Sequence, residues 1–152
     1  VFFDELVKAG KLKVKPGTDV MVYHDPCELG RGCGIYDSPR KLIAGCAFIS
    51  EAPKSHSESV CCGGSLGSLS LDFAHREKIT LASLENLYAS KADAIATACP
   101  LCLSTFSRYA DRPVKDLAQI IDEQTKKYDK NGYEIQKHKL SPSECQQWKC
   151  IR

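Results

Sequence analysis

Several signals that would assign this chain to a common class of protein are missing from its sequence. No run approaches the roughly 18 apolar residues of a transmembrane helix, and no basic segment followed by an apolar one marks a signal peptide. The formal net charge is only +2, which favours neither a nucleic-acid partner nor an anionic membrane. A Ser-His-Asp order, a phosphate-binding glycine loop and a nucleic-acid motif are also absent. We therefore expect a cytoplasmic globular protein with chemistry of another kind.

The length and composition bound the architecture. A chain of 152 residues suits one domain with one sizeable core, and 43% hydrophobic with 26% charged residues is ordinary for such a domain. The chain begins with Val rather than Met and residues 1–9 already have a helical pattern, so we expect a fragment of a longer protein or a missing start. Because polarity rises after Tyr128, we expect a domain over residues 1–127 and a polar extension over residues 128–152.

Cysteine is the abundant residue, with nine copies in the chain. Disulfide frameworks usually belong to short secreted chains with even cysteine counts. This chain is longer and has an odd count, which favours metal-bound thiolates in a reducing compartment.

The adjacent pair Cys61-Cys62 is the most informative part of the pattern. Neighbouring side chains on an extended chain point to opposite sides, so both sulfurs can reach one ligand only where the backbone bends sharply. Gly63 and Gly64 supply that conformational freedom.

Hydrophobic periodicity predicts helices that alternate with short strands. The expected helices cover residues 1–9, 38–46, 69–89, 101–109 and 116–126, and the expected strands cover residues 19–24, 57–60 and 93–98 and begin again at Val114. Ser38 is the expected N-cap of its helix with Pro39 at the first helical position, and Asp116 is the expected cap of the last helix. This alternation predicts a Rossmann-like α/β fold, with a mainly parallel sheet flanked by helices.

Three of the predicted strands are each followed by cysteine. The thiols concerned are Cys27, Cys61, Cys62, Cys99 and Cys102. In parallel sheets ligands collect outside the carboxyl ends of the strands, so we expect all five thiols at one edge of the sheet. Thiolates bind zinc or iron-sulfur clusters. Since structural zinc almost always takes four ligands, a fifth thiol indicates a larger, multi-iron centre.

The residues around these cysteines have expected supporting roles. Asp25 and Pro26 precede Cys27, and Asp25 is expected to hold the loop amides there rather than to act as a base. The Cys27 loop is rich in glycine and contains an extra thiol, Cys33, for which a sixth ligand, a substrate-facing thiol and a bystander all stay open. Cys46 is expected to be plain core.

Other readings also stay open at this point. Cys99-x-x-Cys102 alone would suit a thioredoxin-like dithiol, and Cys145 and Cys150 either bind metal or lie in a tail. Arg31 and Arg40 either steady an anionic cluster or are solvated. His24, a lone histidine, is expected to be a surface or satisfied core residue.

Taken together, these motifs resemble the CCG (cysteine-rich) domain. That domain occurs in the B subunit of heterodisulfide reductase, in the iron-sulfur subunits of glycolate and lactate oxidases, and in the anaerobic glycerol-3-phosphate dehydrogenase. The resemblance covers roughly residues 1–126 and rests on His24-Asp25-Pro26-Cys27-Glu28-Leu29-Gly30-Arg31, Pro39-Arg40, Cys61-Cys62-Gly63-Gly64, Ala98-Cys99-Pro100-Leu101-Cys102 and Val114-Lys115-Asp116-Leu117. One departure is the segment from Gly64 to Ser68, which is less glycine-rich than in the family.

The resemblance implies an oxidoreductase subunit with an iron-sulfur cofactor. Carried over by position, the five cysteines named above would hold a non-cubane [4Fe-4S] cluster that cleaves a disulfide substrate or relays electrons; no residue is assigned as catalytic. The implied partners are flavin subunits and ferredoxin-type iron-sulfur subunits of a redox complex, which would leave the domain in the cytoplasm or peripheral on the cytoplasmic face of a membrane complex. The alternative is a zinc-stabilised CCG domain that docks a partner subunit and has no redox role.

Overall fold

A four-stranded parallel sheet forms the centre of the part of the chain that the structure describes. This computed structural model describes residues 2–129, apart from residues 13, 15 and 65–69. The strands are β1 (Val20–His24), β2 (Phe48–Ile49), β3 (Ala94–Thr97) and β4 (Val114–Asp116), in the spatial order β2-β1-β3-β4. Every neighbouring pair is parallel. The predicted Rossmann-like α/β fold is confirmed.

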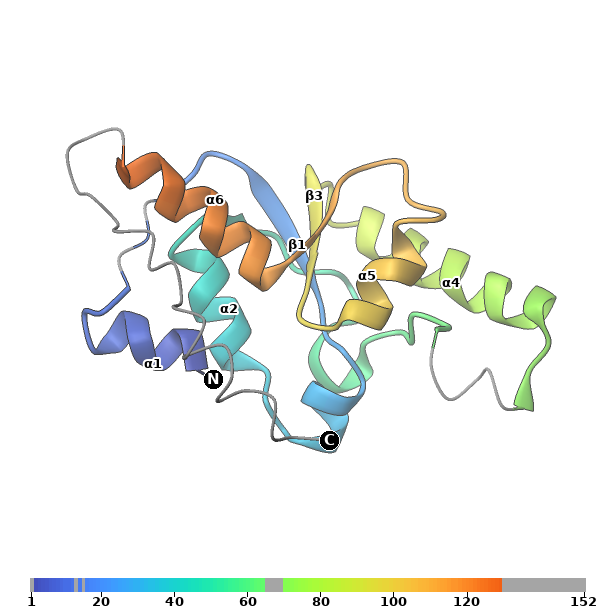
Figure 1. The fold of residues 1–152 in the computed structure, drawn as a ribbon. Helices are drawn as coiled ribbons and strands as arrows, with labels where there is room; N and C mark the ends of the chain where they lie inside the picture. The colour runs from blue at the N-terminus through green and yellow to red at the C-terminus, as the bar shows by residue number, and fades with distance from the viewer. Residues whose placement is uncertain (1, 13, 15, 65–69, 130–152) are drawn as a thin grey trace, which may run out of the picture.

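Helices cover both faces of this sheet (Figure 1). One side has α1 (Phe2–Lys8), α2 (Asp37–Ala44) and α6 (Leu117–Asp129), and the other has α4 (Phe73–Tyr88) and α5 (Pro100–Phe106). Side chains alternate along β1, so that Met21 and Tyr23 pack toward α2 and α6 whereas Val22 packs toward α4 and α5. The central strands are buried on both faces, which explains their continuous apolar runs.

Two predictions about strands and helix starts were wrong. Residues 57–60 do not form a strand: the short 3₁₀ helix η2 (His56–Glu58) and an irregular segment lead to Cys61 instead. The second strand of the chain is Phe48–Ile49, which pairs with β1 through only two residues. Ser38 is not an N-cap, because α2 begins one residue earlier and the Ser38 hydroxyl donates to the Asp4 carboxylate at 3.4 Å.

The glycine-rich segment after Cys27 is helical rather than an open loop. It forms the π-helical turn η1 (Glu28–Gly32), in which the Gly32 amide donates to the Cys27 carbonyl at 3.0 Å. Gly30 is required here, since a Cβ atom at this position would lie 2.8 Å from the Tyr36 ring. Single π-helical turns occur frequently at functional sites.

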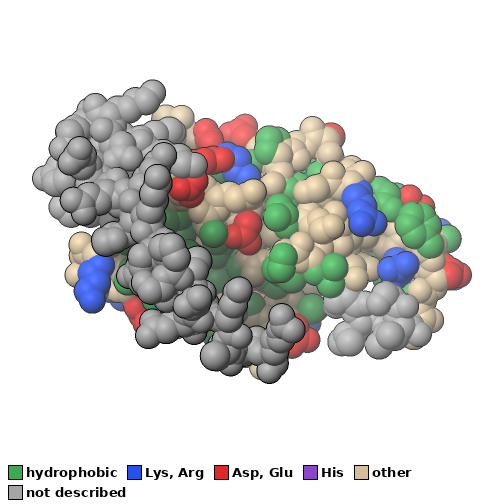
Figure 2. Space-filling model, viewed as in Figure 1, with side chains coloured by type: hydrophobic (Ala, Val, Ile, Leu, Met, Phe, Trp, Pro, Cys, Tyr) green, Lys and Arg blue, Asp and Glu red, His purple; other side chains and the backbone are tan. Residues whose placement is uncertain are grey.

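The remaining predicted elements are confirmed with small changes at their ends. Asp116 caps α6 as predicted, accepting from the Ala118 amide at 2.8 Å. Cys145 and Cys150 lie outside the described residues, so the boundary at residue 127 stays a prediction. No helix within the described ranges is both long and apolar enough to cross a bilayer. Basic and acidic side chains are scattered over the face shown in Figure 2.

Candidate metal centre

A cavity of about 230 Å³ lies at the carboxyl edge of the sheet, where β1 and β3 end. Its lining residues are Pro26, Cys27, Glu28, Leu29, Cys62, Ala98, Cys99, Pro100, Leu101 and Cys102. Four of the five predicted thiols thus line one space, although they come from three segments far apart in the sequence. Cys61 does not line it but directly precedes Cys62.

The strand ends place two of these thiols. Cys27 follows β1 through Asp25 and Pro26, and it directly precedes the π-helical turn. Cys99 follows β3 and is the N-cap residue of α5, with Pro100 at the first helical position. One turn later, Cys102 is buried and its thiol lies 3.3 Å from the Cys62 sulfur.

Helix α4 holds the loop that contains Cys61 and Cys62, in place of the predicted strand. The Thr80 hydroxyl donates to the Cys62 carbonyl at 2.8 Å, and the Ser83 hydroxyl donates to the Val60 carbonyl at 3.2 Å. Gly63 turns the chain with φ +81°. The backbone then supplies donors to both sulfurs, because the Gly63 and Gly64 amides point at the Cys61 and Cys62 sulfurs at 3.4 Å.

A buried ion-pair network supports the start of the Cys27 segment. Arg40 donates to both oxygens of the Asp25 carboxylate at 2.6 and 2.8 Å and also to Glu51 at 2.7 Å. Asp25 is only 3% exposed, and it accepts from the His56 amide at 2.7 Å. Asp25 therefore holds a loop amide as expected, but the amide belongs to the segment before Cys61. One carboxylate thus joins the two cysteine segments.

The arginines of the resemblance motif act within the protein. Burial alone would lower the pKa of Arg40, but its hydrogen bonds to Asp25 and Glu51 outweigh this effect and the pKa is raised. Arg31 donates to the Ser59 carbonyl at 2.8 Å, near enough to Cys61 for its charge to oppose the rise in that thiol's pKa. Arg31 thereby places a positive charge beside the cysteine pair.

The cysteine pair is strongly coupled. Hydrogen bonding from Cys102, together with burial, raises the pKa of Cys62 to about 11. The neighbouring Cys62 thiol and burial raise the pKa of Cys61 as well. Thiols with raised pKa values stay protonated near neutral pH, and a bound metal displaces those protons because its ligands must be thiolates.

The other thiols of the described chain lie apart from this cavity. Cys46 is buried in the core between the sheet and α2, as predicted, and burial raises its pKa. Cys33 is exposed just after the π-helical turn and does not line the cavity, so its role stays open.

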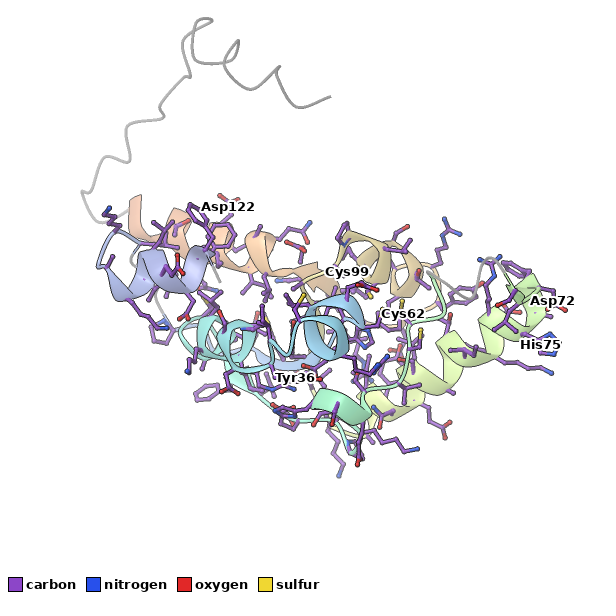
Figure 3. The ribbon with its side chains drawn as sticks, turned by 90° about the horizontal axis from the view of Figure 1, so that it is seen from below. Tyr36, Cys62, Asp72, His75, Cys99 and Asp122 are labelled. Carbon is purple, nitrogen blue, oxygen red and sulfur yellow. The ribbon has the colours of Figure 1, made fainter. Side chains whose placement is uncertain are left out.

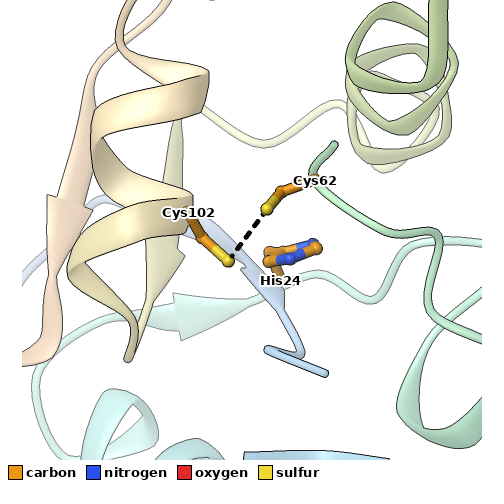
Figure 4. Close-up of side chains that lie close together, drawn as sticks. All are labelled: His24, Cys62 and Cys102. Atoms are coloured by element: carbon orange, nitrogen blue, oxygen red, sulfur yellow. Dashed lines mark hydrogen bonds between the residues drawn. The ribbon is translucent and has the colours of Figure 1, made fainter. Parts of the chain in front are cut away.

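His24 is a site residue that sequence reasoning missed. It is the last residue of β1, is 2% exposed, and has an imidazole nitrogen within 4.8 Å of the sulfurs of Cys62 and Cys102 (Figure 4). Its Nδ1 is buried with no hydrogen-bond partner in the described structure. Burial lowers the pKa of His24 to about 4, with Asp25 opposing this shift. His75, by contrast, pairs with Asp72 at the distant end of α4 (Figure 3).

Comparison with known proteins assigns the chain to a family. A family model described as the CCG cysteine-rich domain matches residues 21–107, a span that includes all five predicted ligands. The chain belongs to the CCG family of cysteine-rich domains. The sequence resemblance is thereby confirmed, and the CCG domain here places its cysteine motifs around the cavity.

Curated relatives of this CCG domain are redox proteins by name. It is 35% identical over 104 residues to the probable iron-sulfur-binding oxidoreductase FadF of Bacillus subtilis, which is 66% of this chain and 15% of that protein. It is 31% identical over 135 residues to one subunit of the dihydromethanophenazine:CoB--CoM heterodisulfide reductase of Methanosarcina barkeri, covering 80% and 32%. It is 29% identical over 128 residues to a probable membrane-anchored ferredoxin of Chromohalobacter salexigens, covering 79% and 19%. The chain thus matches a third or less of the length of each of these relatives.

Proposed function

We propose that this CCG domain holds an iron-sulfur centre in the thiol cavity and transfers electrons as part of an oxidoreductase complex. The observation that carries the proposal is the convergence of Cys27, Cys62, Cys99 and Cys102 on one cavity. The iron-sulfur and oxidoreductase names of the relatives support it. When bound, an iron-sulfur centre supplies one-electron chemistry at a potential set by the protein around it.

The residues present suit such a centre. Cysteine thiolates are the usual ligands of iron-sulfur clusters, and the cavity is several times the roughly 30 Å³ that one water molecule occupies in the liquid. The side chains of Pro26, Leu29 and Leu101 line it alongside the cysteines. An apolar lining limits solvent access, and solvent access is one of the factors that set a cluster's potential.

The finer proposal is a five-cysteine, non-cubane [4Fe-4S] cluster that acts on a disulfide or relays electrons. The adjacency of Cys61 to Cys62, with a backbone amide directed at each sulfur, supports Cys61 as the fifth ligand. The name of the heterodisulfide reductase relative supports a disulfide substrate. Flavin and ferredoxin-type subunits are the partners that we propose, and the membrane-anchored name of one relative supports a peripheral position on a membrane complex.

A zinc site is the second candidate, because one specific observation favours it. A nitrogen of His24 and the sulfurs of Cys62 and Cys102 lie within 4.8 Å of one another, a grouping that suits a single zinc ion. A domain of this kind would dock a partner subunit without transferring electrons.

Reversible reduction separates the two candidates. Protein purified without oxygen should be brown, bleach with dithionite, and regain its visible band on re-oxidation, with an EPR signal in one of the two states. Addition of a disulfide should alter that signal if the substrate proposal is right. A colourless protein with about one zinc per chain would instead establish the docking candidate and exclude the electron-transfer role.

A further inference from the structure

Two buried polar groups without partners lie side by side at the carboxyl edge of the sheet. His24 on β1 and Thr97 on β3 are register partners across the parallel pair. Nδ1 of His24 and the Thr97 hydroxyl are both buried, and neither has a hydrogen-bond partner in the described part of the chain. A buried group in this condition costs about 1–3 kcal/mol and calls for an explanation, such as a ligand or a functional role.

The surroundings of His24 fix the place of its ring. Phe106 of α5 packs edge-to-face against the imidazole, with ring centroids 4.8 Å apart and an interplanar angle of 85°. His24 does not line the thiol cavity, whereas Cys62 and Cys102 do. The imidazole therefore approaches the two sulfurs from the protein side rather than from the space that a metal would fill.

The pair Cys62 and Cys102 lacks hydrogen-bond donors once it binds metal. The 3.3 Å contact between their sulfurs is a hydrogen bond in which the Cys102 thiol is the donor. A thiolate that ligates metal has no proton to donate, so this bond is lost. The Gly64 amide still serves Cys62, but no donor to the Cys102 sulfur is found among the described residues. Two negative sulfurs then lie close together with one of them unsupported.

We propose that His24 donates an N–H hydrogen bond to the Cys102 sulfur in the metal-loaded protein and thereby tunes the reduction potential of the centre. This inference rests on the iron-sulfur centre proposed above. His24 is a positioning residue and not a metal ligand. The bond pairs the unpartnered donor with the unsupported acceptor through a small movement, since their atoms already lie within 4.8 Å.

The predicted effect has a definite direction. Reduction adds negative charge to an iron-sulfur centre, and a hydrogen bond to a ligand sulfur stabilises that charge; such bonds are among the factors that set cluster potentials. Loss of the His24 donor should therefore shift the midpoint potential to a lower value. Loss of a hydrogen-bond partner behind a metal ligand also typically weakens metal binding by about 10- to 100-fold.

The test compares four variants with the wild type, all purified without oxygen and matched for iron and sulfide content. His24→Leu removes the donor. His24→Asn keeps an N–H near the position of Nδ1, and His24→Gln keeps one near Nε2. Phe106→Leu changes the packing around the ring but leaves the donor in place, so it controls for a purely structural role.

The expected result is a lower midpoint potential for His24→Leu, an unshifted potential for Phe106→Leu, and recovery by either His24→Asn or His24→Gln. Pulsed EPR in D₂O should also show an exchangeable proton coupled to the wild-type centre that is lost in His24→Leu. Equal potentials in wild type and His24→Leu would overturn the inference while leaving the iron-sulfur centre intact, and a directly coordinated nitrogen in the pulsed EPR spectrum would overturn it too. A wild type without iron and sulfide would contradict the proposed function itself, and the inference with it.

Discussion

At the scale of single residues, Gly63 fixes the path of the chain directly after the cysteine pair. Its φ of +81° lies in the left-handed region that side chains other than glycine rarely adopt. A Cβ atom there would lie 2.7 Å from the Arg76 carbonyl and 2.7 Å from the Thr80 hydroxyl. Thr80 also holds the Cys62 carbonyl, so crowding at Gly63 acts on the group that positions Cys62.

We predict that Gly63→Ala lowers the free energy of unfolding by roughly 1–3 kcal/mol and reduces the iron content. The matched control is Gly10→Ala, because Gly10 has a similar φ of +68° but no atom within 4 Å of an added Cβ. Urea unfolding and iron analysis of both variants give the measurement. Equal losses in the two variants would mean that backbone strain alone matters and that the contact with Thr80 has no role.

His24 shows what a single sequence cannot reveal at this scale. A lone histidine at the end of a strand reads as a surface or core residue, because sequence does not show which partners surround it. Its place beneath two sulfurs depends on Phe106, which is far away in the chain, and on the register of β1 with β3. The five cysteines were easier to predict, since adjacent thiols followed by glycines have few other uses.

At the scale of secondary-structure elements, the strands with long apolar runs were predictable and the short ones were not. Strands β1 and β3 are buried on both faces, and they deliver Cys27 and Cys99 to one edge as predicted. Strand β2 has two residues and no pattern to detect. The Cys61-Cys62 loop reaches the same edge without a strand, because α4 holds its carbonyls. The site was thus predicted correctly although one element was wrong.

The link between α2 and the cysteine segments can be tested through Arg40. We predict that Arg40→Gln destabilises the fold by about 3–5 kcal/mol, since it leaves the buried Asp25 carboxylate without its charged partner. Urea unfolding measures the loss. The control is Lys115→Gln, which removes the more exposed pair with Glu123 and should cost at most about 1 kcal/mol. Similar losses in both variants would show that the Asp25 network has no special role.

At the scale of the whole molecule, the proposed centre connects parts of the chain that secondary structure alone does not join. Its thiols come from the segment after β1, the loop before α4 and the start of α5. A ligand that binds only the folded state stabilises it, and metal ligands gathered from separate segments exist together only in that state.

Removal of the metal should therefore lower the thermal midpoint. A site loaded at about 100 times its Kd contributes about 2.7 kcal/mol, which corresponds to roughly 5–10 °C for a chain of this size. We predict a fall of this order when an iron chelator is added without oxygen, as followed by circular dichroism. Cys62→Ser protein should show no such response. An unchanged midpoint in the wild type would argue that the metal is peripheral to the fold.

The most direct test of the central claim is the iron and acid-labile sulfide content of three proteins purified without oxygen: the wild type, Cys62→Ser and Cys46→Ser. Both substituted thiols are buried, but only Cys62 lines the cavity. Cavity thiols that hold an iron-sulfur centre predict about four irons with matching sulfide in the wild type and in Cys46→Ser, and a large loss of both in Cys62→Ser. Equal iron in all three proteins, or zinc without sulfide in the wild type, would contradict this account.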